Sequence, residues 1–191
     1  MSIPKILAFA GSTRTDSWNK KLIRVAVDGA RAADAEVTLI DLRDLPLPLY
    51  DGDLEAAGFP ENAKKLKRLF LDHQGLLISS PEYNSSISGV LKNAIDWVSR
   101  SEPGEGALAC FVDKVAALLS ASPGALGGLR GLVHLRAILG NIKVLVLPDQ
   151  IAVSKAHEAF NPDGSLKDAK QSASVHKLAK TLGDTIAKLR G

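Results

Sequence analysis

The segment 6–19, which reads ILAFAGSTRTDSWN, decides how the rest of the chain is interpreted. Its first five residues are apolar, as in a buried strand, and its last residues begin a helical pattern. Between them, Gly11 permits a sharp turn into a loop that carries hydroxyl groups, a guanidinium and the unpaired N–H groups of a helix start. This order predicts an anion-binding loop at the carboxyl end of the first strand of an α/β sheet.

Apolar runs alternate with helical periodicity along the whole chain. The runs are short, mostly continuous and rich in Ile, Leu and Val, which is typical of parallel strands that are covered on both faces. They occupy residues 5–10, 36–41, 75–79, 114–120 and 142–147. Helical periodicity occupies residues 17–33, 61–71, 90–99 and 129–139, and a long terminal helix is expected around residues 175–189. The alternation predicts one α/β domain over residues 1–191, a flavodoxin-like, doubly wound, five-stranded parallel sheet of order 2-1-3-4-5 with helices on both faces.

The composition favours an ordinary water-soluble domain. The 191 residues are 46% apolar and 24% charged, and the net charge of +3 is spread along the chain, so nucleic-acid binding is not expected. No apolar run approaches the roughly 20 residues that cross a bilayer, and nothing resembles a signal peptide, so we expect a cytoplasmic protein without a membrane segment. The single cysteine, Cys110, excludes an intrachain disulfide, and the four histidines lack metal-ligand spacing, so no metal is expected.

Two further polar loops follow predicted strands. Residues 79–86 read SSPEYNSS after the third strand, and residues 120–128 read SASPGALGG after the fourth. Strands one, three and four adjoin in the predicted order, so both loops converge with the 11–19 loop on one crevice at the topological switch point. Pro81 holds its neighbours extended and turns backbone N–H and C=O groups outward, where they suit the edge of a flat heteroaromatic ring. An anion loop beside such an edge predicts a mononucleotide site.

Three motifs resemble those of the NADPH-dependent FMN reductase family, which includes soluble quinone, chromate and azo-dye reductases. They are Gly11-Ser12-Thr13-Arg14 with Ser17 and Asn19, then Pro81-Glu82-Tyr83-Asn84, and then Gly89–Trp97. The resemblance covers nearly the whole chain and implies bound FMN, with NADPH or NADH as electron donor. It also implies that hydride passes from nicotinamide to N5 of FMN and that two electrons then reach a quinone or a similar acceptor, such as chromate, an azo compound or free flavin. Because only one open crevice is expected, a ping-pong cycle follows.

The resemblance also assigns contacts to individual residues. The FMN phosphate is assigned to Ser12, Arg14, Ser17 and Asn19, with Thr13 through the backbone amides of the same loop. The isoalloxazine edge is assigned to Pro81, Glu82, Tyr83 and Asn84, and the third flavin loop to Ser120, Ala121, Ser122 and Gly124. Ala121 stands where a serine is common in the family, so only backbone contacts are expected there. Ser88 stands where proline is usual, which is expected to loosen the start of the following helix.

Several roles stay open on sequence alone. Ser17 serves either as a helix N-cap or as a phosphate ligand. Trp18 either shields the flavin or contacts a second subunit, and we expect Glu82 to pair with a neighbouring subunit or a buried arginine rather than to act as a base. The choice between NADPH and NADH depends on an arginine for the 2′-phosphate. The candidates are Arg100, Arg130 and Arg136.

Two other function classes remain as alternatives, and the assembly is also open. A flavodoxin-type electron carrier shares the fold and FMN but binds a protein partner; such carriers are strongly acidic, whereas this chain is mildly basic. A phosphate-ester hydrolase would have only Asp16 as a nucleophile in the 11–19 loop. The family forms dimers and tetramers, so a homodimer or homotetramer is expected, with the apolar segment 45–50 either at a subunit contact or as a surface cover over the sheet.

Overall fold

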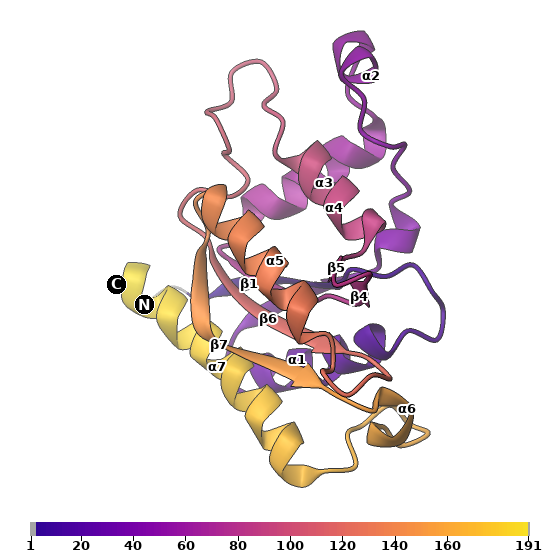
Figure 1. The fold of residues 1–191 in the computed structure, drawn as a ribbon. Coiled ribbons are helices and arrows are strands. Elements are labelled where there is room, and N and C mark those ends of the chain that lie inside the picture. Colours follow the sequence, from indigo (N-terminus) through magenta and orange to yellow (C-terminus); the bar gives the residue numbers. More distant parts are fainter. Residues whose placement is uncertain (1–2, 191) are drawn as a thin grey trace.

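A five-stranded parallel sheet forms the centre of the computed structural model, which describes residues 3–190 (Figure 1). The strands are β1 (Lys5–Ala10), β2 (Glu36–Ile40), β3 (Gly75–Ser79), β6 (Val115–Ala121) and β7 (Leu145–Val153). Their spatial order is β2-β1-β3-β6-β7, and every neighbouring pair is parallel. The predicted order 2-1-3-4-5 is therefore confirmed.

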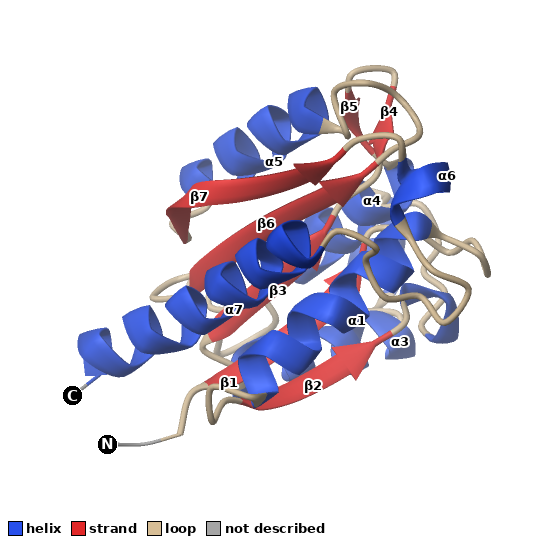
Figure 2. Ribbon diagram, turned by 90° about the horizontal axis from the view of Figure 1, so that it is seen from below, coloured by secondary structure: helices blue, strands red, loops and turns tan. Residues whose placement is uncertain are grey.

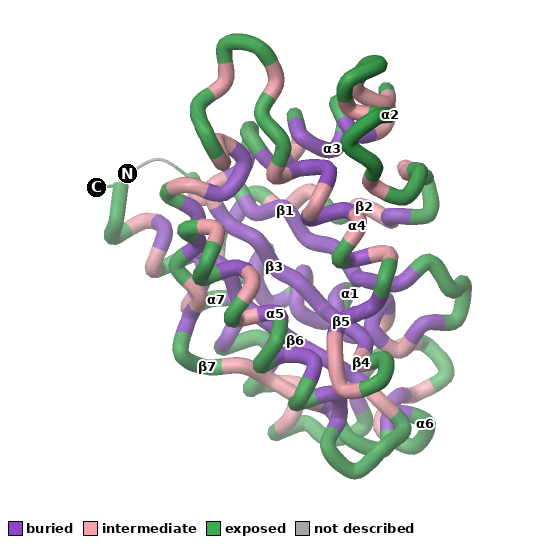
Figure 3. The backbone as a smooth tube through the Cα atoms, turned by 45° about the horizontal axis from the view of Figure 1, so that its top comes forward, coloured by how far each residue is buried: buried purple, intermediate pink, exposed green. Residues whose placement is uncertain are grey.

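Helices cover both faces of this sheet (Figure 2). The helices are α1 (Trp18–Arg31) and α7 (Ala169–Arg190) on one face, and α3 (Glu61–Asp72), α4 (Gly89–Val98) and α5 (Leu129–Asn141) on the other. Alternate residues of β1 enter the two apolar cores, with Ile6 and Ala8 on the α1 side and Leu7 and Phe9 on the opposite side. Since both faces of the three central strands β1, β3 and β6 are buried, as Figure 3 shows, these strands are largely apolar, whereas the edge strands β2 and β7 are partly exposed.

The terminal helix is longer than expected and packs closely on α1. It begins at Ala169 rather than near residue 175 and buries an apolar stripe that includes Val175 and Leu182. A Cβ added to Gly29 of α1 would lie 2.6 Å from the Cα of His176, so only glycine permits this approach of the two helices. Although α7 has 22 residues, none of the described helices is both long and apolar enough to span a membrane.

The fifth strand corrects the sequence prediction of residues 142–147. It runs instead over Leu145–Val153, because Ile142 ends α5 and Lys143 turns with a φ of 73°. The strand continues past Pro148 through a register shift opposite Ala116 and Leu118. Arg136 of α5 supports this irregular stretch by donating from Nη1 to the Leu147 carbonyl at 2.7 Å. A proline is tolerated because β7 is an edge strand.

Five short elements were not predicted. They are η1 (Leu42–Asp44), α2 (Gly52–Ala57), β4 (Glu82–Tyr83), β5 (Ser86–Ile87) and α6 (Ala156–Ala159). Helix α2 buries none of its residues, so it carries no apolar stripe for the sequence to display. Strands β4 and β5 form a separate antiparallel hairpin beyond the carboxyl end of β3.

Candidate functional site

Three loops meet at the carboxyl ends of β1, β3 and β6, as the strand order predicts. They enclose a small cavity of about 80 Å³. Its lining residues are Ser12, Arg14, Ser17, Trp18, Asn19, Pro81, Glu82, Tyr83, Ala121, Ser122 and Pro123. All of these except Pro123 were assigned as site residues from the sequence. Of the other assigned residues, Thr13 lines a neighbouring cavity, and Asn84, Ser120 and Gly124 line neither.

The first loop presents polar groups that have no protein partner. Gly11 anchors the loop by donating its N–H to the Ser79 carbonyl at 2.9 Å. Ser17 is buried at the N-cap position of α1 with extended backbone, yet its hydroxyl makes no capping hydrogen bond. Within residues 3–190, no acceptor pairs with the backbone N–H groups of Thr13 and Ser17. Free N–H groups and a free hydroxyl at a helix start form an anion-binding arrangement.

A second guanidinium, missed from the sequence, stands beside this loop. Arg43 in η1 donates from Nη1 to Thr15 Oγ1 at 2.6 Å. Its position is set by Asp41, whose carboxylate accepts the Arg43 backbone N–H and the Lys20 ammonium. Partial burial alone would raise the pKa of Asp41, but the hydrogen bonds from Lys20 and Arg43 lower it below its usual value. Arg43 follows β2, and the only sequence signal for it was its place near the end of a strand.

Asn19 joins the ends of two central strands. Its Nδ2 donates to the Ala121 carbonyl at 2.9 Å, and its Oδ1 accepts the Ala121 N–H at 3.0 Å and the Ser79 hydroxyl at 2.9 Å. The N–H of Ala121 is thereby used within the protein, so it is not free for the backbone contact expected from the sequence. The phosphate contact assigned to Asn19 stays a prediction, while its structural role at the switch point is evident.

Ser120 holds a buried hydroxyl without a partner. Its Oγ is the one buried side-chain polar atom in residues 3–190 that lacks a hydrogen bond. Gly128 lies directly against it, because a Cβ at that position would be 1.9 Å from Ser120 Oγ, and its φ of 92° also requires glycine. Buried polar groups are almost always paired, so this unpaired hydroxyl beside the cavity-lining Ala121 is unusual, and its contact with a ligand stays a prediction.

The second loop forms a tight β-hairpin. Glu82 pairs with Ile87 and Tyr83 with Ser86. Asn84 and Ser85 make the turn with positive φ values of 51° and 64°, as in the turns that favour two-residue hairpins. Tyr83 is half exposed at the rim of the cavity. The extended backbone predicted around Pro81 is thus present, and its contact with a ring edge stays a prediction.

Two expectations about this part of the site are wrong. Glu82 does pair with an arginine, but that residue is Arg130 of the same chain, whose side chain is 58% exposed. Ser88 does not loosen the start of α4, because its hydroxyl accepts the Leu91 N–H at 3.2 Å and donates to the Gly11 carbonyl at 2.6 Å. Serine therefore caps this helix and ties it to the first loop, which proline cannot do.

Trp18 packs within its own chain. Its ring stacks on Phe160, with 5.8 Å between ring centroids and 13° between planes, and Lys21 Nζ lies 4.6 Å from the Trp18 ring. Because Trp18 also lines the 80 Å³ cavity, it links the segment after α6 to the first loop. Neither of the two sequence-based roles, flavin shield or subunit contact, is needed to explain its burial.

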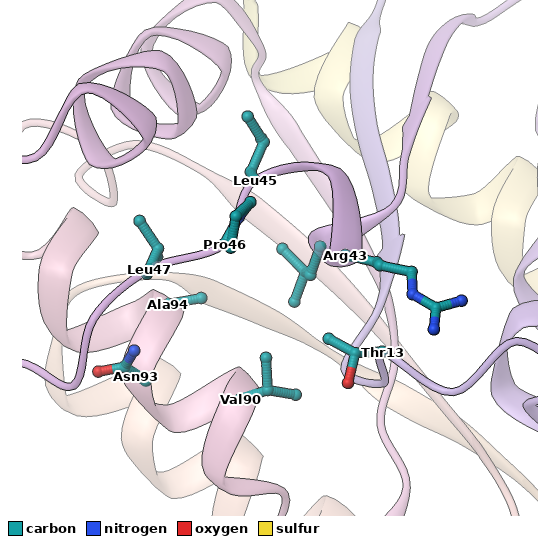
Figure 4. Close-up of a pocket in the computed structure, with 9 residues that line it drawn as sticks. Thr13, Arg43, Leu45, Pro46, Leu47, Val90, Asn93 and Ala94 are labelled. Carbon is teal, nitrogen blue, oxygen red and sulfur yellow. The ribbon is translucent and has the colours of Figure 1, made fainter.

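A larger cavity of about 310 Å³ lies beside the first loop (Figure 4). Leu45, Pro46 and Leu47 form one wall, and Val90 and Ala94 of α4 form another. This lining is largely apolar, so the cavity does not suit a phosphate.

The extended segment 45–50 that forms the first wall is bound to α4. Asn93 Nδ2 and Trp97 Nε1 donate to the Pro48 carbonyl at 2.9 and 2.8 Å, and Asn93 Oδ1 accepts the Tyr50 N–H at 2.8 Å. The segment therefore lies over α4, and it leaves the Leu49 side chain 81% exposed.

The charges and unpaired groups at the 80 Å³ cavity suit the phosphate of FMN. The first loop carries free N–H groups and Arg14, which suit a phosphate, whereas a contact of the hairpin backbone with a ring edge stays a prediction. Desolvation alone would raise the pKa of Glu82, but hydrogen bonds from the Gly131 N–H and Arg130 lower it below its usual value. Glu82 is therefore a paired carboxylate at neutral pH, and no general base is present among these lining residues.

The chain is similar in sequence and structure to known flavin-dependent and quinone reductases. The NAD(P)H-dependent FMN reductase PA1204 of Pseudomonas aeruginosa is 36% identical over 188 residues, which cover 98% of this chain and 97% of that protein. A probable NADPH:quinone oxidoreductase 2 of Oryza sativa is 33% identical over 98% of this chain and 91% of its own. The solved structure of FerB, a flavoenzyme NAD(P)H:(acceptor) oxidoreductase from Paracoccus denitrificans, superposes with a TM-score of 0.82 at 29% identity, covering 97% of this chain and 98% of its own.

A family model matches residues 4–158, which contain all three loops. The resemblance seen in the sequence motifs is thereby confirmed, as is an enzymatic role with FMN as cofactor and NAD(P)H as donor. The chain belongs to the NADPH-dependent FMN reductase family.

Proposed function

We propose that this protein is a cytoplasmic, single-domain oxidoreductase that takes electrons from NAD(P)H through FMN and delivers them to quinones or similar small acceptors, including azo compounds, chromate and free flavin. The observation that carries the proposal is the set of unpaired N–H and hydroxyl groups that the first loop places at a cavity lined by all three loops. Family membership favours an enzyme over an electron carrier or a phosphate-ester hydrolase.

The chain's own residues would hold the cofactor in two places. The N–H groups and hydroxyls of residues 12–17, with Arg14, bind the phosphate at the start of α1. The β4–β5 hairpin directs backbone groups at the ring edge, where N–H donors favour developing negative charge. When bound, FMN supplies hydride acceptance and two-electron transfer, so the protein needs no acid–base pair.

One open crevice implies that donor and acceptor use the same flavin face in turn. The half-exposed Tyr83 borders the cavity on the hairpin side, and Pro123 borders it on the third loop. Initial rates at several acceptor concentrations should therefore give parallel double-reciprocal lines. Intersecting lines would mean that both substrates are bound together, which would contradict a shared face.

We expect weak discrimination between NADPH and NADH. All three candidate arginines are held by protein groups: Arg100 Nε lies 3.0 Å from Glu55 Oε2, Arg130 Nη2 lies 2.6 Å from Glu82 Oε1, and Arg136 Nη2 lies 3.0 Å from Gln150 Oε1. None is thus poised for a 2′-phosphate within one chain. The ratio of kcat/KM for the two donors should stay within about tenfold, since a dedicated bidentate arginine contributes more than that.

The segment 45–50 is the proposed contact in a homodimer or homotetramer. Its apolar side chains border the 310 Å³ cavity, and Leu49 is largely exposed on a backbone that Asn93 and Trp97 hold rigid. Rigid, exposed apolar groups are typical of subunit contacts. Light scattering should report an oligomer at micromolar concentration, and Leu49→Glu should shift it toward monomer, with Leu189→Glu on α7 as the control. A wild-type monomer would exclude this assembly.

The decisive experiment is an anaerobic visible spectrum of the purified protein with one equivalent of FMN, before and after NADPH. We expect retained yellow flavin that bleaches within seconds. Bound FMN that ignores both NADPH and NADH would favour a carrier, and failure to retain FMN would contradict the site. Phosphatase activity without FMN would instead favour a hydrolase.

A further inference from the structure

The β4–β5 hairpin that borders the cavity has little internal support. It consists of two residue pairs, and it belongs to a sheet of its own rather than to the central one. A two-stranded ribbon of this size is not stable by itself in water. Figure 2 shows the hairpin beside the end of α5 where that helix begins. Contacts with α5 therefore decide where the hairpin lies.

Helix α5 begins without a capping side chain of its own. Its N-cap is Gly128, which adopts left-handed backbone and offers no side-chain acceptor. The N–H of Gly131, two residues after the first helical residue Leu129, is a group that an N-cap side chain normally satisfies. Here the Glu82 carboxylate of the hairpin accepts this N–H, at 3.1 Å from Oε2.

The other carboxylate oxygen of Glu82 is also bound by α5. Oε1 accepts from Arg130 Nε at 2.9 Å and from Arg130 Nη2 at 2.6 Å. A carboxylate at a helix N-terminus is stabilised by the helix dipole. Arg130 also neutralises a negative charge that would otherwise border an anion-binding cavity.

The backbone of the hairpin lies directly on α5 as well. A Cβ added to Gly131 would lie 3.1 Å from the Ser86 carbonyl oxygen and 3.3 Å from Glu82 Cβ, so a larger residue would require the hairpin to shift by a few tenths of an ångström. His134 Nδ1 and Ser86 Oγ are 2.9 Å apart, so the second strand contacts α5 one turn further along.

We infer that Glu82 is a positioning residue that caps α5 and, together with Arg130, clamps the hairpin onto the helix. The inference rests on the proposed flavin function of the hairpin. The start of α5 is continuous with the third loop, so the clamp holds the second and third loops as one unit. Glu82 thus acts on the ring edge through the hairpin backbone, and its own carboxylate is occupied by α5.

The first test measures the hairpin in the protein without FMN. In Glu82→Ala, amide hydrogens of residues 82–88 should exchange with deuterium about tenfold faster, as expected when a cap and an ion pair are lost. Glu82→Gln keeps the length and one acceptor for Gly131, so it should recover part of this protection. Glu61→Gln, which removes an exposed ion pair with Lys64 on α3, is the matched control and should change nothing. Unchanged exchange in Glu82→Ala would overturn the clamp.

The second test measures the flavin site. Glu82→Ala should weaken FMN binding about tenfold and shift the midpoint potential of the bound flavin, while the melting temperature changes by only about 3 °C. A merely structural role for Glu82 would lower the melting temperature without moving the potential, and that result would overturn the inference. If the wild-type protein retains no FMN, the proposed function fails, whereas the exchange experiment still decides whether the clamp exists.

Discussion

Polar groups in the cluster around Lys67 are paired within the protein, whereas several polar groups near the cavity formed by the three loops have no partner within the described part of the chain. Lys67 is 2% exposed, and its ammonium donates to the Arg100 carbonyl and lies 2.6 Å from Glu105 Oε2. At the cavity, the Ser17 hydroxyl makes no capping bond, and Ser120 Oγ, which is buried next to the cavity-lining Ala121, has no partner. Polar groups that are paired inside the protein stabilise the fold, and groups that are left unpaired at a strand end indicate a ligand.

The region around Lys67 also joins two segments of the chain, residues 50–55 and residues 100–105. Glu55 accepts from the Tyr50 hydroxyl at 2.8 Å and from Arg100 Nε at 3.0 Å, and Glu105 accepts the Glu102 N–H at 2.9 Å. Desolvation alone would raise the pKa of Glu105, but the Glu102 N–H and Lys67 lower it below its usual value. The ion pairs and hydrogen bonds of Glu55 and Glu105 therefore hold these segments together. We expect substitutions here to change the free energy of unfolding rather than flavin binding.

Replacing Lys67 should produce the largest effect on stability. Lys67→Met leaves Glu105 and the Arg100 carbonyl without their buried partner, so the free energy of unfolding should fall by about 3 kcal/mol. FMN affinity should not change. Lys64→Met on the same helix removes only an exposed pair with Glu61 and should cost less than about 1 kcal/mol. Urea titration and FMN titration measure both quantities, and a loss of FMN affinity in Lys67→Met would remove the distinction between the two regions.

Lys114 provides a pH-dependent version of the same comparison. It is a buried cation whose ammonium donates to a neutral group, the His73 carbonyl, and desolvation lowers its pKa from 10.5 to about 8. Between these values the unfolded chain binds the extra proton, so stability should rise with pH, by up to about 3 kcal/mol between pH 8 and 10.5. Subtracting the profile of Lys114→Met isolates this contribution. A difference profile that is flat or falls over this range would contradict the assignment.

Replacing Arg14 should have the opposite effect to replacing Lys67: it should weaken FMN binding and leave stability nearly unchanged. Arg14 is exposed and lines the cavity, so Arg14→Gln should leave the free energy of unfolding nearly unchanged. FMN affinity should fall about 10- to 100-fold, as expected for one charge-assisted contact with phosphate. Arg24→Gln removes the same charge from the exposed side of α1 and controls for general electrostatics. Equal losses in both variants would show that only net charge matters.

Replacing Ser120 should have the smallest effect on the free energy of unfolding, and the direction of that effect shows whether its hydroxyl has a partner. Removing a buried hydroxyl that has no partner should raise the stability of the FMN-free protein by about 1 kcal/mol. Ser99→Ala is the contrasting variant, because the Ser99 hydroxyl donates to the Asp96 carbonyl at 2.8 Å and its loss should be destabilising. FMN affinity should fall only in Ser120→Ala. If Ser120→Ala destabilises the protein as Ser99→Ala does, the Ser120 hydroxyl has a structural partner.

Much of the architecture was predictable because it depends on local patterns. Continuous apolar runs identified the five sheet strands, and their alternation with helices left few topologies, of which the chosen order β2-β1-β3-β6-β7 is the one observed. The fifth strand was placed too early because its passage beyond Pro148 depends on a register shift against β6 and on support from Arg136. Helix α2 had no buried stripe to detect.

The sequence by itself determined the strands, the three loops at their ends and a small set of possible strand orders, because hydrophobic periodicity marks the strands and right-handed crossovers restrict the topology. Only the tertiary structure decided which polar groups are partnered. Asn19 and Ala121 are 102 positions apart, and Glu82 and Gly131 are 49 apart, yet each pair is joined by hydrogen bonds. A hydrogen bond depends on distance and direction in space, and a one-dimensional pattern carries no information about either at such separations.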